Sequence, residues 1–551
     1  MSDTSVTKKA APLPDLPGAG MAEAGALPAQ DLTGRQQLVS NVLFSWGGQM
    51  VFIVAGFIMP RMIDHHLGQA VLGLWDFAWS LVAYFQFIEA GITGSVNRYV
   101  ARYWAIQDIS SIKRIVTSAT MILALSGTLI LILSGGLSAL LPYLFSDQLG
   151  THVFGARAAV FCLGASLCVQ TSLGAYNGVV AGCHRWDLLN INRGGWQFAT
   201  TAAMIGALVM GGGLLSLAVI TLIGETCGQA GRVVIAYRVC KGLRLTPSLV
   251  NRATIGELYV YGAKILVPSI SNMLLNSATS TLMVAYLGPA ALALFARPRA
   301  LIRQIDSLVR RMTMALIPTV SSLEGAGDIA AIRSLLIKSV RYTLYIILPA
   351  VIVLTIFGGA VMQLWMGPRY AAGLLVAVLT LGSFGPLAQT PMLCVLAGLN
   401  SHGRPGVAQC IASGLAALLV YVALGPLHLG VIGAALGVSV PFALTGMVYN
   451  SIVVCRRLSM RLGEYVWTVS WKPILHLLPF VIILLVCRFC FARSQLIGLA
   501  AGLAAGCPVL AFVYWRKVLP VALKHTILDR LSRRSSLSRE ADRRLPVAHS
   551  I

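Results

Sequence analysis

The sequence predicts an all-α protein that crosses a membrane about 14 times. Of its 551 residues, 57% are hydrophobic and only 11% are charged, whereas an average soluble domain carries about 25% charged residues. Apolar stretches of about 18 to 25 residues recur along the chain, and each is long enough to cross a hydrocarbon core of about 30 Å as a helix. Lys and Arg residues gather in alternate connections, which is the positive-inside pattern of membrane proteins. The bilayer is therefore the solvent of this chain.

Each predicted spanning helix is one such apolar stretch. The spans are 41–60, 70–92, 115–136, 154–181, 194–212, 214–236, 265–287, 290–317, 342–362, 372–398, 406–424, 429–454, 473–490 and 496–515. The predicted parts of the chain are a cytoplasmic tail without regular structure (1–40), a six-helix lobe (41–240), a cytoplasmic linker (241–264), a second six-helix lobe (265–455), two additional spanning helices (456–515) and a basic cytoplasmic tail (516–551). The first tail is rich in Ala, Pro and Gly and has no apolar core, so it does not resemble a signal peptide.

The net charge of +23 does not predict a nucleic-acid partner, because the basic residues lie in alternate connections and near the chain ends. This distribution places both termini in the cytoplasm. In residues 516–551, basic side chains alternate with apolar ones, a pattern that suits the anionic lipids of an inner leaflet. A solvated tail without a function is the alternative for this segment.

The eleven cysteines are dispersed, and most lie in or beside apolar spans, as small hydrophobic side chains do. The lone C-x-x-C pair, Cys487 and Cys490, has no second pair with which to complete a metal site. The sequence therefore predicts no disulfide framework, metal or cofactor.

An internal repeat relates the two lobes. Residues 67–75 (LGQAVLGLW) match residues 287–295 (LGPAALALF), and a weaker echo pairs 181–185 with 397–404. Each copy holds six spans, an even number, so both copies enter the membrane in the same direction, as in a parallel repeat. Two such bundles around one cavity favour alternating access. A chance match in Leu-, Ala- and Gly-rich sequence is the alternative.

Short motifs near the ends of the spans indicate a family. They are Pro60, Leu67-Gly68, Leu72-Gly73-Leu74-Trp75, Glu89-Ala90-Gly91, Asn97-Arg98-Tyr99, Leu316-Ile317-Pro318, Ser321, Leu323, Gly327-Asp328, Arg341-Tyr342 and Leu364-Trp365-Met366-Gly367. In order and spacing, these motifs resemble those of the polysaccharide-biosynthesis flippases of the multidrug/oligosaccharidyl-lipid/polysaccharide exporter (MOP) superfamily. The resemblance extends over residues 40–515.

The resemblance implies a transporter rather than an enzyme, located in the bacterial inner membrane. Its implied substrate is an undecaprenyl-pyrophosphate-linked oligosaccharide repeat unit, which two six-helix lobes move from the cytoplasmic to the periplasmic leaflet. A glycan polymerase and other polysaccharide assembly proteins are the implied protein partners.

One polar stripe marks span eight. Arg299, Arg303, Asp306, Arg310 and Thr313 follow one another at spacings of 4, 3, 4 and 3 residues, which places them on one face of a helix. Charged side chains at membrane depth are costly, so we expect the stripe to face a wet cavity or a protein partner. Guanidinium forks match phosphate oxygens, which predicts an anionic ligand.

Within this stripe, Arg303 is nearest the centre of the span, and we expect Asp306 to hold it in place when no substrate is bound. Arg297 lies on the opposite side of the same helix. The alternative for Arg310 and its neighbour Arg311 is that they reach lipid headgroups at the inner surface.

Other polar side chains within the spans are further candidates for substrate binding. The repeat places Trp79 and Gln86 of span two at the positions of stripe residues, and Gln49, Asn272 and Asn276 lie in spans one and seven. Stacking on sugars and hydrogen bonds to hydroxyl groups would suit them. Ordinary helix packing is the alternative, since small polar residues also hold membrane helices together.

Glu225 lies near the middle of span six. A carboxylate there is a candidate for coupling transport to a proton or Na⁺, or for an ion pair with an Arg such as one of the stripe.

Three rival functions remain beside the flippase. A multidrug and toxin extrusion antiporter moves cations and calls for acids rather than arginines in its cavity. A lipid II flippase shares the cationic cavity and the number of spans. A membrane glycan polymerase or transferase needs a sizeable loop outside the membrane, and the outside loops of this sequence are short.

Overall fold

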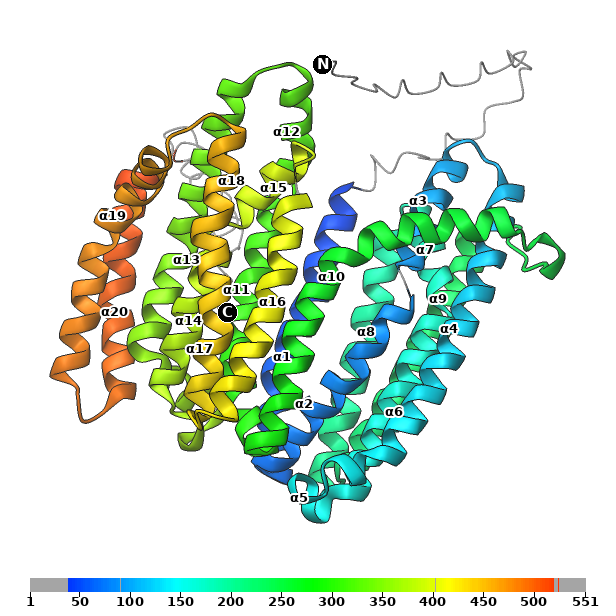
Figure 1. The fold of residues 1–551 in the computed structure, drawn as a ribbon, viewed down its shortest axis with the longest axis horizontal. Coiled ribbons are helices and arrows are strands. Elements are labelled where there is room, and N and C mark those ends of the chain that lie inside the picture. The colour runs from blue at the N-terminus through cyan, green and yellow to red at the C-terminus, as the bar shows by residue number, and fades with distance from the viewer. Residues whose placement is uncertain (1–37, 90, 402, 520–523, 525–551) are drawn as a thin grey trace, which may run out of the picture.

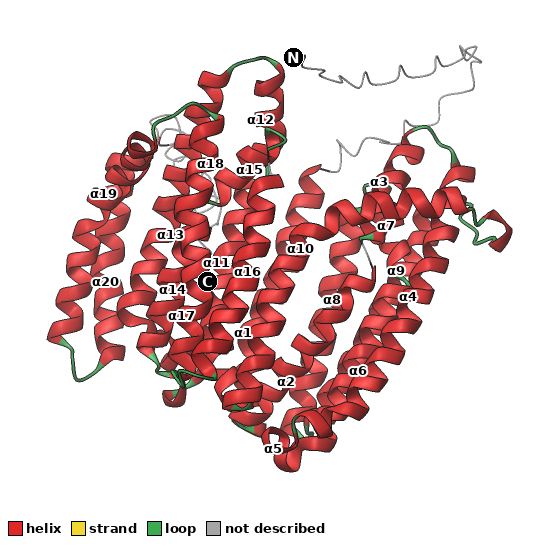
Figure 2. Cartoon of the chain, viewed as in Figure 1, coloured by secondary structure: helices red, strands yellow, loops and turns green. Residues whose placement is uncertain are grey.

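The computed structural model describes residues 38–89, 91–401, 403–519 and 524; nearly all of these residues are helical, and none of them lies in a strand. Figures 1 and 2 show the helices as two bundles with an additional pair beside the second bundle. Residues 1–37 of the tail expected over 1–40, and most of the tail expected over 516–551, lie outside the described residues; residues 38–40 belong to the first helix. The all-α prediction is confirmed.

The first bundle contains α1 to α9. Its elements are α1 (Leu38–Leu67), α2 (Gln69–Ala83), η1 (Tyr84–Glu89), α3 (Ile92–Ala105), α4 (Ile109–Leu144), α5 (Ser146–Leu149), η2 (Gly150–His152), α6 (Val153–Ser172), α7 (Gly174–Gly182), α8 (Trp186–Val209) and α9 (Leu214–Val239). A short connection with η3 (Pro247–Leu249) leads to the second bundle.

The second bundle contains α10 to α18, and the additional pair is α19 and α20. These elements are α10 (Arg252–Leu287), α11 (Pro289–Thr313), α12 (Leu316–Gly325), α13 (Ile329–Met366), η4 (Pro368–Tyr370), α14 (Gly373–Ala388), α15 (Thr390–Gly398), α16 (Gly403–Leu424), α17 (Gly430–Ala443), η5 (Leu444–Tyr449), α18 (Asn450–Arg457), α19 (Leu462–Cys490), α20 (Gln495–Val513) and η6 (Tyr514–Val518). The pair packs against α13.

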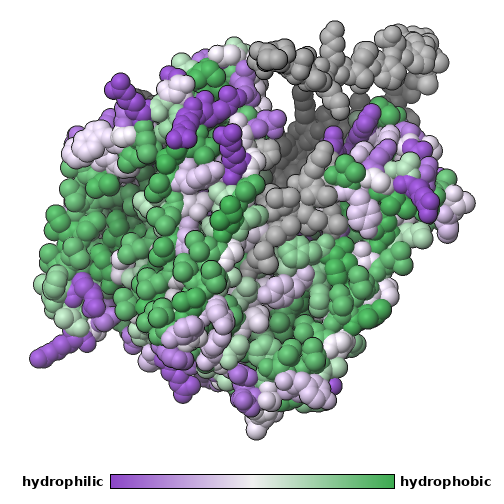
Figure 3. Space-filling model, in the orientation of Figure 1, coloured by the Kyte–Doolittle hydropathy of each residue, from purple (hydrophilic) through white to green (hydrophobic). Residues whose placement is uncertain are grey.

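Among the described residues, 11 helical stretches are long and apolar enough to cross a membrane. The three remaining predicted spans, 194–212, 265–287 and 290–317, overlap α8, α10 and α11. Helix α11 carries arginines through its middle, so its mean hydropathy is low although its length suffices. Figure 3 shows hydrophobic surface over the middle of the visible face and hydrophilic residues gathered toward the two ends, as expected for a protein in a bilayer.

The internal repeat appears in the backbone. Gly68 precedes α2 and Gly288 precedes α11. The φ and ψ angles are 86° and 167° at Gly68, and 81° and 172° at Gly288. A positive φ of this size favours glycine. Asp108 and Asp328 cap the two longest matching helices, α4 and α13, and each carboxylate accepts a hydrogen bond from the backbone N–H three residues later. The two lobes are therefore built on one plan, as the repeat predicted.

The N-terminal ends of α2 and α11 meet where the two lobes touch. A Cβ atom at Gly73 would lie 1.8 Å from the carbonyl oxygen of Pro289, so only glycine fits there. Nearby, Gln69 donates to the carbonyl oxygen of Ala290 at 3.2 Å, and Arg61 donates to the carbonyl oxygen of Trp365 at 2.8 Å. These contacts hold the lobes together at the end of the molecule where α1 finishes and α2 begins.

Candidate functional site

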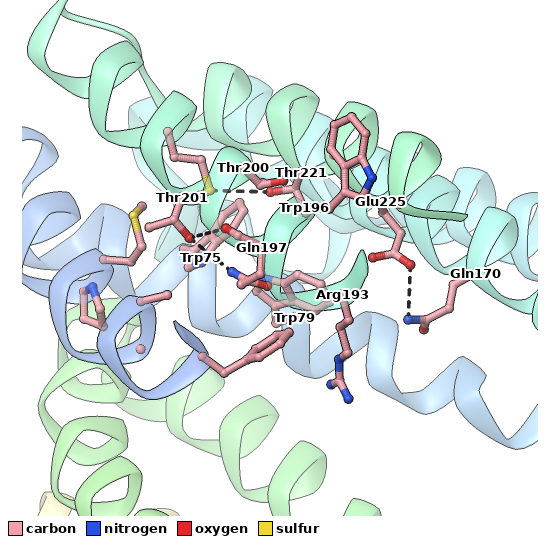
Figure 4. Close-up of a pocket in the computed structure, with 18 of the residues that line it drawn as sticks. Trp75, Trp79, Gln170, Arg193, Trp196, Gln197, Thr200, Thr201, Thr221 and Glu225 are labelled. Carbon is pink, nitrogen blue, oxygen red and sulfur yellow. Dashed lines mark hydrogen bonds between the residues drawn. The ribbon is translucent and has the colours of Figure 1, made fainter. Parts of the chain in front are cut away.

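A cavity of about 660 Å³ lies within the first lobe, between α1, α2, α8 and α9. We call it the N-lobe cavity. Figure 4 shows side chains from these helices around it. Four tryptophans line this cavity together with several amide side chains and hydroxyl groups, and the tryptophans are Trp75, Trp79, Trp186 and Trp196. Indole faces and amides of this kind suit a ligand that has both apolar faces and hydroxyl groups.

A second cavity, of about 270 Å³, lies between the lobes, and α2, α10 and α11 line it. We call it the inter-lobe cavity. Asp76 and Trp79 line both cavities, so the two spaces adjoin at α2. Arg299 and Arg303 of the predicted stripe lie on its α11 wall. The structure therefore brings Trp79 together with the first half of the stripe.

Arg299 is held in position inside the inter-lobe cavity. Its Nη2 donates to the Oδ1 of Asn276 at 2.7 Å, and its guanidinium lies 5.4 Å from the centre of the Phe295 ring. Arg303 is exposed on the cavity wall, and within the described ranges no carboxylate lies at ion-pair distance from it. The site thus offers one anchored guanidinium and one free guanidinium to an anion.

The second half of the predicted stripe, Asp306, Arg310 and Thr313, does not line the inter-lobe cavity. Asp306 accepts a hydrogen bond from the Nε of Arg310 at 2.7 Å, so the expectation that Asp306 holds Arg303 is wrong. Arg303 and Arg310 are both neighbours of Asp306 on the helix surface, and the side chain of Asp306 turns toward Arg310. Thr313 is buried and donates to the carbonyl oxygen of Val309 at 3.0 Å, which removes it from the exposed stripe.

Arg297, which the sequence places on the opposite side of α11 from Arg303, has a partner of its own. It is 5% exposed and forms an ion pair with Asp76 of α2. Arg297 also lines the N-lobe cavity. This pair joins the two repeat-related helices between the two cavities. Asp76 was not singled out from the sequence, although an acidic residue within an apolar span could have indicated it.

Glu225 lines the N-lobe cavity and its Oε1 is surrounded by donors. Gln229 donates to it at 2.7 Å, Gln170 at 3.5 Å, and the Nη1 of Arg232 lies 3.7 Å away. Glu225 therefore pairs with an arginine, which is one of the two expected roles, but that arginine is Arg232 of α9, two turns further on, and not a residue of the stripe. Figure 4 shows Glu225 turned toward Gln170.

Three other predicted site residues lie elsewhere or are not described. Gln86 is exposed in η1 and lines neither cavity. Gln49 accepts a hydrogen bond from Arg311 at 2.5 Å, which joins α1 to α11 outside both cavities. The side chain of Asn272 lies outside the described residues.

Two comparisons concern the sequence. Residues 102–373 match the model of a family described as "Polysaccharide biosynthesis protein". No curated protein is significantly similar to the chain.

Solved structures share the fold at low identity. The chain is similar to the lipid II flippase MurJ in an inward closed conformation, with 12% identity, a TM-score of 0.66, and coverage of 87% of this chain and 100% of that one. It is similar to an inward-facing multidrug resistance MATE family transporter of the MOP superfamily, with 14% identity, a TM-score of 0.57, and coverage of 74% and 98%. A MOP superfamily transporter from Pyrococcus furiosus gives 13% identity, a TM-score of 0.52, and coverage of 78% and 97%. Together with the family match, these likenesses confirm the resemblance that the motifs indicated.

Proposed function

We propose that this chain, which has the MOP superfamily fold and matches the polysaccharide-biosynthesis family over residues 102–373, is a flippase for a lipid-linked oligosaccharide. The substrate is an oligosaccharide repeat unit on undecaprenyl pyrophosphate, moved across the bacterial inner membrane by alternating access. Both termini are cytoplasmic, and no chemical step is required of the protein.

The observation that carries this proposal is the exposed guanidinium of Arg303 beside that of Arg299 in the inter-lobe cavity. Two arginines at membrane depth are costly unless an anion or water faces them. A pyrophosphate diester presents oxygens that guanidinium forks bind through charge-assisted hydrogen bonds. The adjoining N-lobe cavity, with its tryptophans and amides, is the space for the attached sugars.

The fold fits a multidrug extruder and a lipid II flippase as well, so the choice rests on the chemistry of the cavity. A cationic drug would meet Arg299 and Arg303 without a free carboxylate in the inter-lobe cavity, since Asp76 is paired with Arg297. The cavity charge therefore disfavours cation export. Lipid II carries the same pyrophosphate, and only its sugars and peptide distinguish it from a repeat unit.

The experiment is deletion of the gene in its host, followed by extraction and mass spectrometry of the undecaprenyl-linked lipids. We expect one discrete oligosaccharide to accumulate on the cytoplasmic leaflet and to disappear when the wild-type gene is restored. Accumulation of lipid II in its place would assign the chain to peptidoglycan synthesis. An unchanged lipid profile together with sensitivity to cationic drugs would overturn the proposal.

A further inference from the structure

The N-lobe cavity holds an excess of positive charge. Its charged lining residues are three arginines and two carboxylates, namely Arg193, Arg232, Arg297, Asp76 and Glu225. Asp76 pairs with Arg297, and Glu225 with Arg232. Within the described part of the chain, Arg193 has no carboxylate at ion-pair distance. One guanidinium is left for a ligand.

The neighbouring side chains hold Arg193 in a position from which it can bind a ligand. Its guanidinium lies 4.5 Å from the centre of the Phe52 ring, so α1 supplies an apolar platform for a side chain that comes from α8. Stacking of this kind leaves the N–H donors at the edge of the guanidinium available to a planar anion. In Figure 4, Arg193 enters the same space as Trp79 and Gln197, while Glu225 is turned away toward Gln170.

The rest of the lining indicates what carries the anion. The tryptophans offer flat apolar faces, which suit the C–H faces of sugar rings, and the amide side chains suit hydroxyl groups. The volume of about 660 Å³ lies within the range of about 300 to 1,000 Å³ found for small-molecule pockets. The pyrophosphate of the substrate has its own place at Arg299 and Arg303, which line the other cavity.

We propose that the N-lobe cavity binds an acidic glycan, and that Arg193 binds the carboxylate of a uronic acid in it. This proposal rests on the proposed function and adds the substrate class: an oligosaccharide with at least one carboxylate sugar, placed apart from the pyrophosphate. Arg193 is then a specificity-determining residue, because a neutral glycan would leave its charge without a counter-ion.

The test uses the purified full-length chain in lipid nanodiscs and isothermal titration calorimetry. The probes are a trisaccharide with one glucuronic acid and the same trisaccharide with that carboxyl group reduced to the alcohol. We expect the acidic probe to bind wild type at least about ten-fold more tightly, the usual effect of one charge-assisted pair. Arg193→Gln should remove the preference, and Arg193→Lys should restore only part of it, since an ammonium lacks the fork.

Arg456→Gln is the matched control, because Arg456 is exposed at the end of α18 and lines neither cavity; it should keep the wild-type preference. Elution as a single symmetric peak in size-exclusion chromatography checks that each variant is folded. Equal affinity of wild type for the two probes, or a preference that survives Arg193→Gln, would overturn the carboxylate assignment. Binding of undecaprenyl pyrophosphate is measured in parallel. If it persists while the sugar preference is absent, only this inference fails; if it is absent as well, the proposed function fails too.

Discussion

The ion pair between Asp76 and Arg297 predicts a specific pattern of stability changes. The two side chains are 21% and 6% exposed, and they join α2 to α11 between the two cavities. Removing one partner leaves the other charge buried without a counter-ion, which costs about 3 to 5 kcal/mol at fully buried pairs. Because Asp76 retains some exposure, we expect Arg297→Met and Asp76→Leu each to cost about 3 kcal/mol.

The double variant Asp76→Leu/Arg297→Met removes both charges, so it should be close to wild type in stability and more stable than either single variant. The assay is thermal unfolding of the four purified proteins in one detergent, read as a double-mutant cycle. If each single variant unfolds like wild type, the pair does not stabilise the lobe contact. If the double variant loses the sum of the two single effects, the side chains act independently and the reasoning about a shared buried charge is refuted.

Two further predictions concern the contact between the lobes and the repeat. Gly73→Ala should lower the unfolding temperature and the membrane yield, because its Cβ would lie 1.8 Å from the carbonyl oxygen of Pro289. Gly414→Ala, a helical position with nothing within 4 Å of its Cβ, is the control and should be neutral or stabilising; a neutral Gly73→Ala would contradict the close contact. Asp108→Ala and Asp328→Ala should each cost about 1 kcal/mol of stability, since each removes the cap of a matching helix, whereas the two Asp→Asn variants should cost less. Thermal unfolding measures both losses. If the loss of stability differs between Asp108→Ala and Asp328→Ala, the two caps are not equivalent in the two copies of the repeat.

Local patterns were sufficient to predict much of the fold and part of the site. The 220-residue repeat in the sequence reappears as the matched backbone at Gly68 and Gly288. The spacing of Arg299 and Arg303 correctly placed both on one helix face, and the structure puts that face on a cavity. Helical periodicity and the cost of charge in a membrane act within single helices, so a sequence reveals them.

Contacts between residues far apart in the chain could not be predicted from the sequence. Asp76 and Arg297 are 221 positions apart, and their contact depends on how the lobes pack. Arg193 was missed because span five was expected to begin at residue 194, whereas α8 begins at Trp186 and carries Arg193 about two turns into the helix. The partner expected for Asp306 was wrong because Arg303 and Arg310 both lie within helical reach of it, and the direction of its side chain chose between them. The arginine that pairs with Glu225 lies seven residues away on the same helix, beyond the usual spacing of helical pairs.

The affinity of the purified protein for undecaprenyl pyrophosphate, compared between wild type and Arg303→Ala, tests the central claim most directly. Charge-assisted hydrogen bonds contribute about 1.5 to 3 kcal/mol each, so we expect Arg303→Ala to weaken binding by about ten-fold to over a hundred-fold. Arg303→Lys should recover little, and Arg456→Ala should bind like wild type. Tetraphenylphosphonium, a cationic probe, should not compete. Unchanged affinity in Arg303→Ala, or tighter binding of tetraphenylphosphonium than of undecaprenyl pyrophosphate, would contradict an anion-binding cavity.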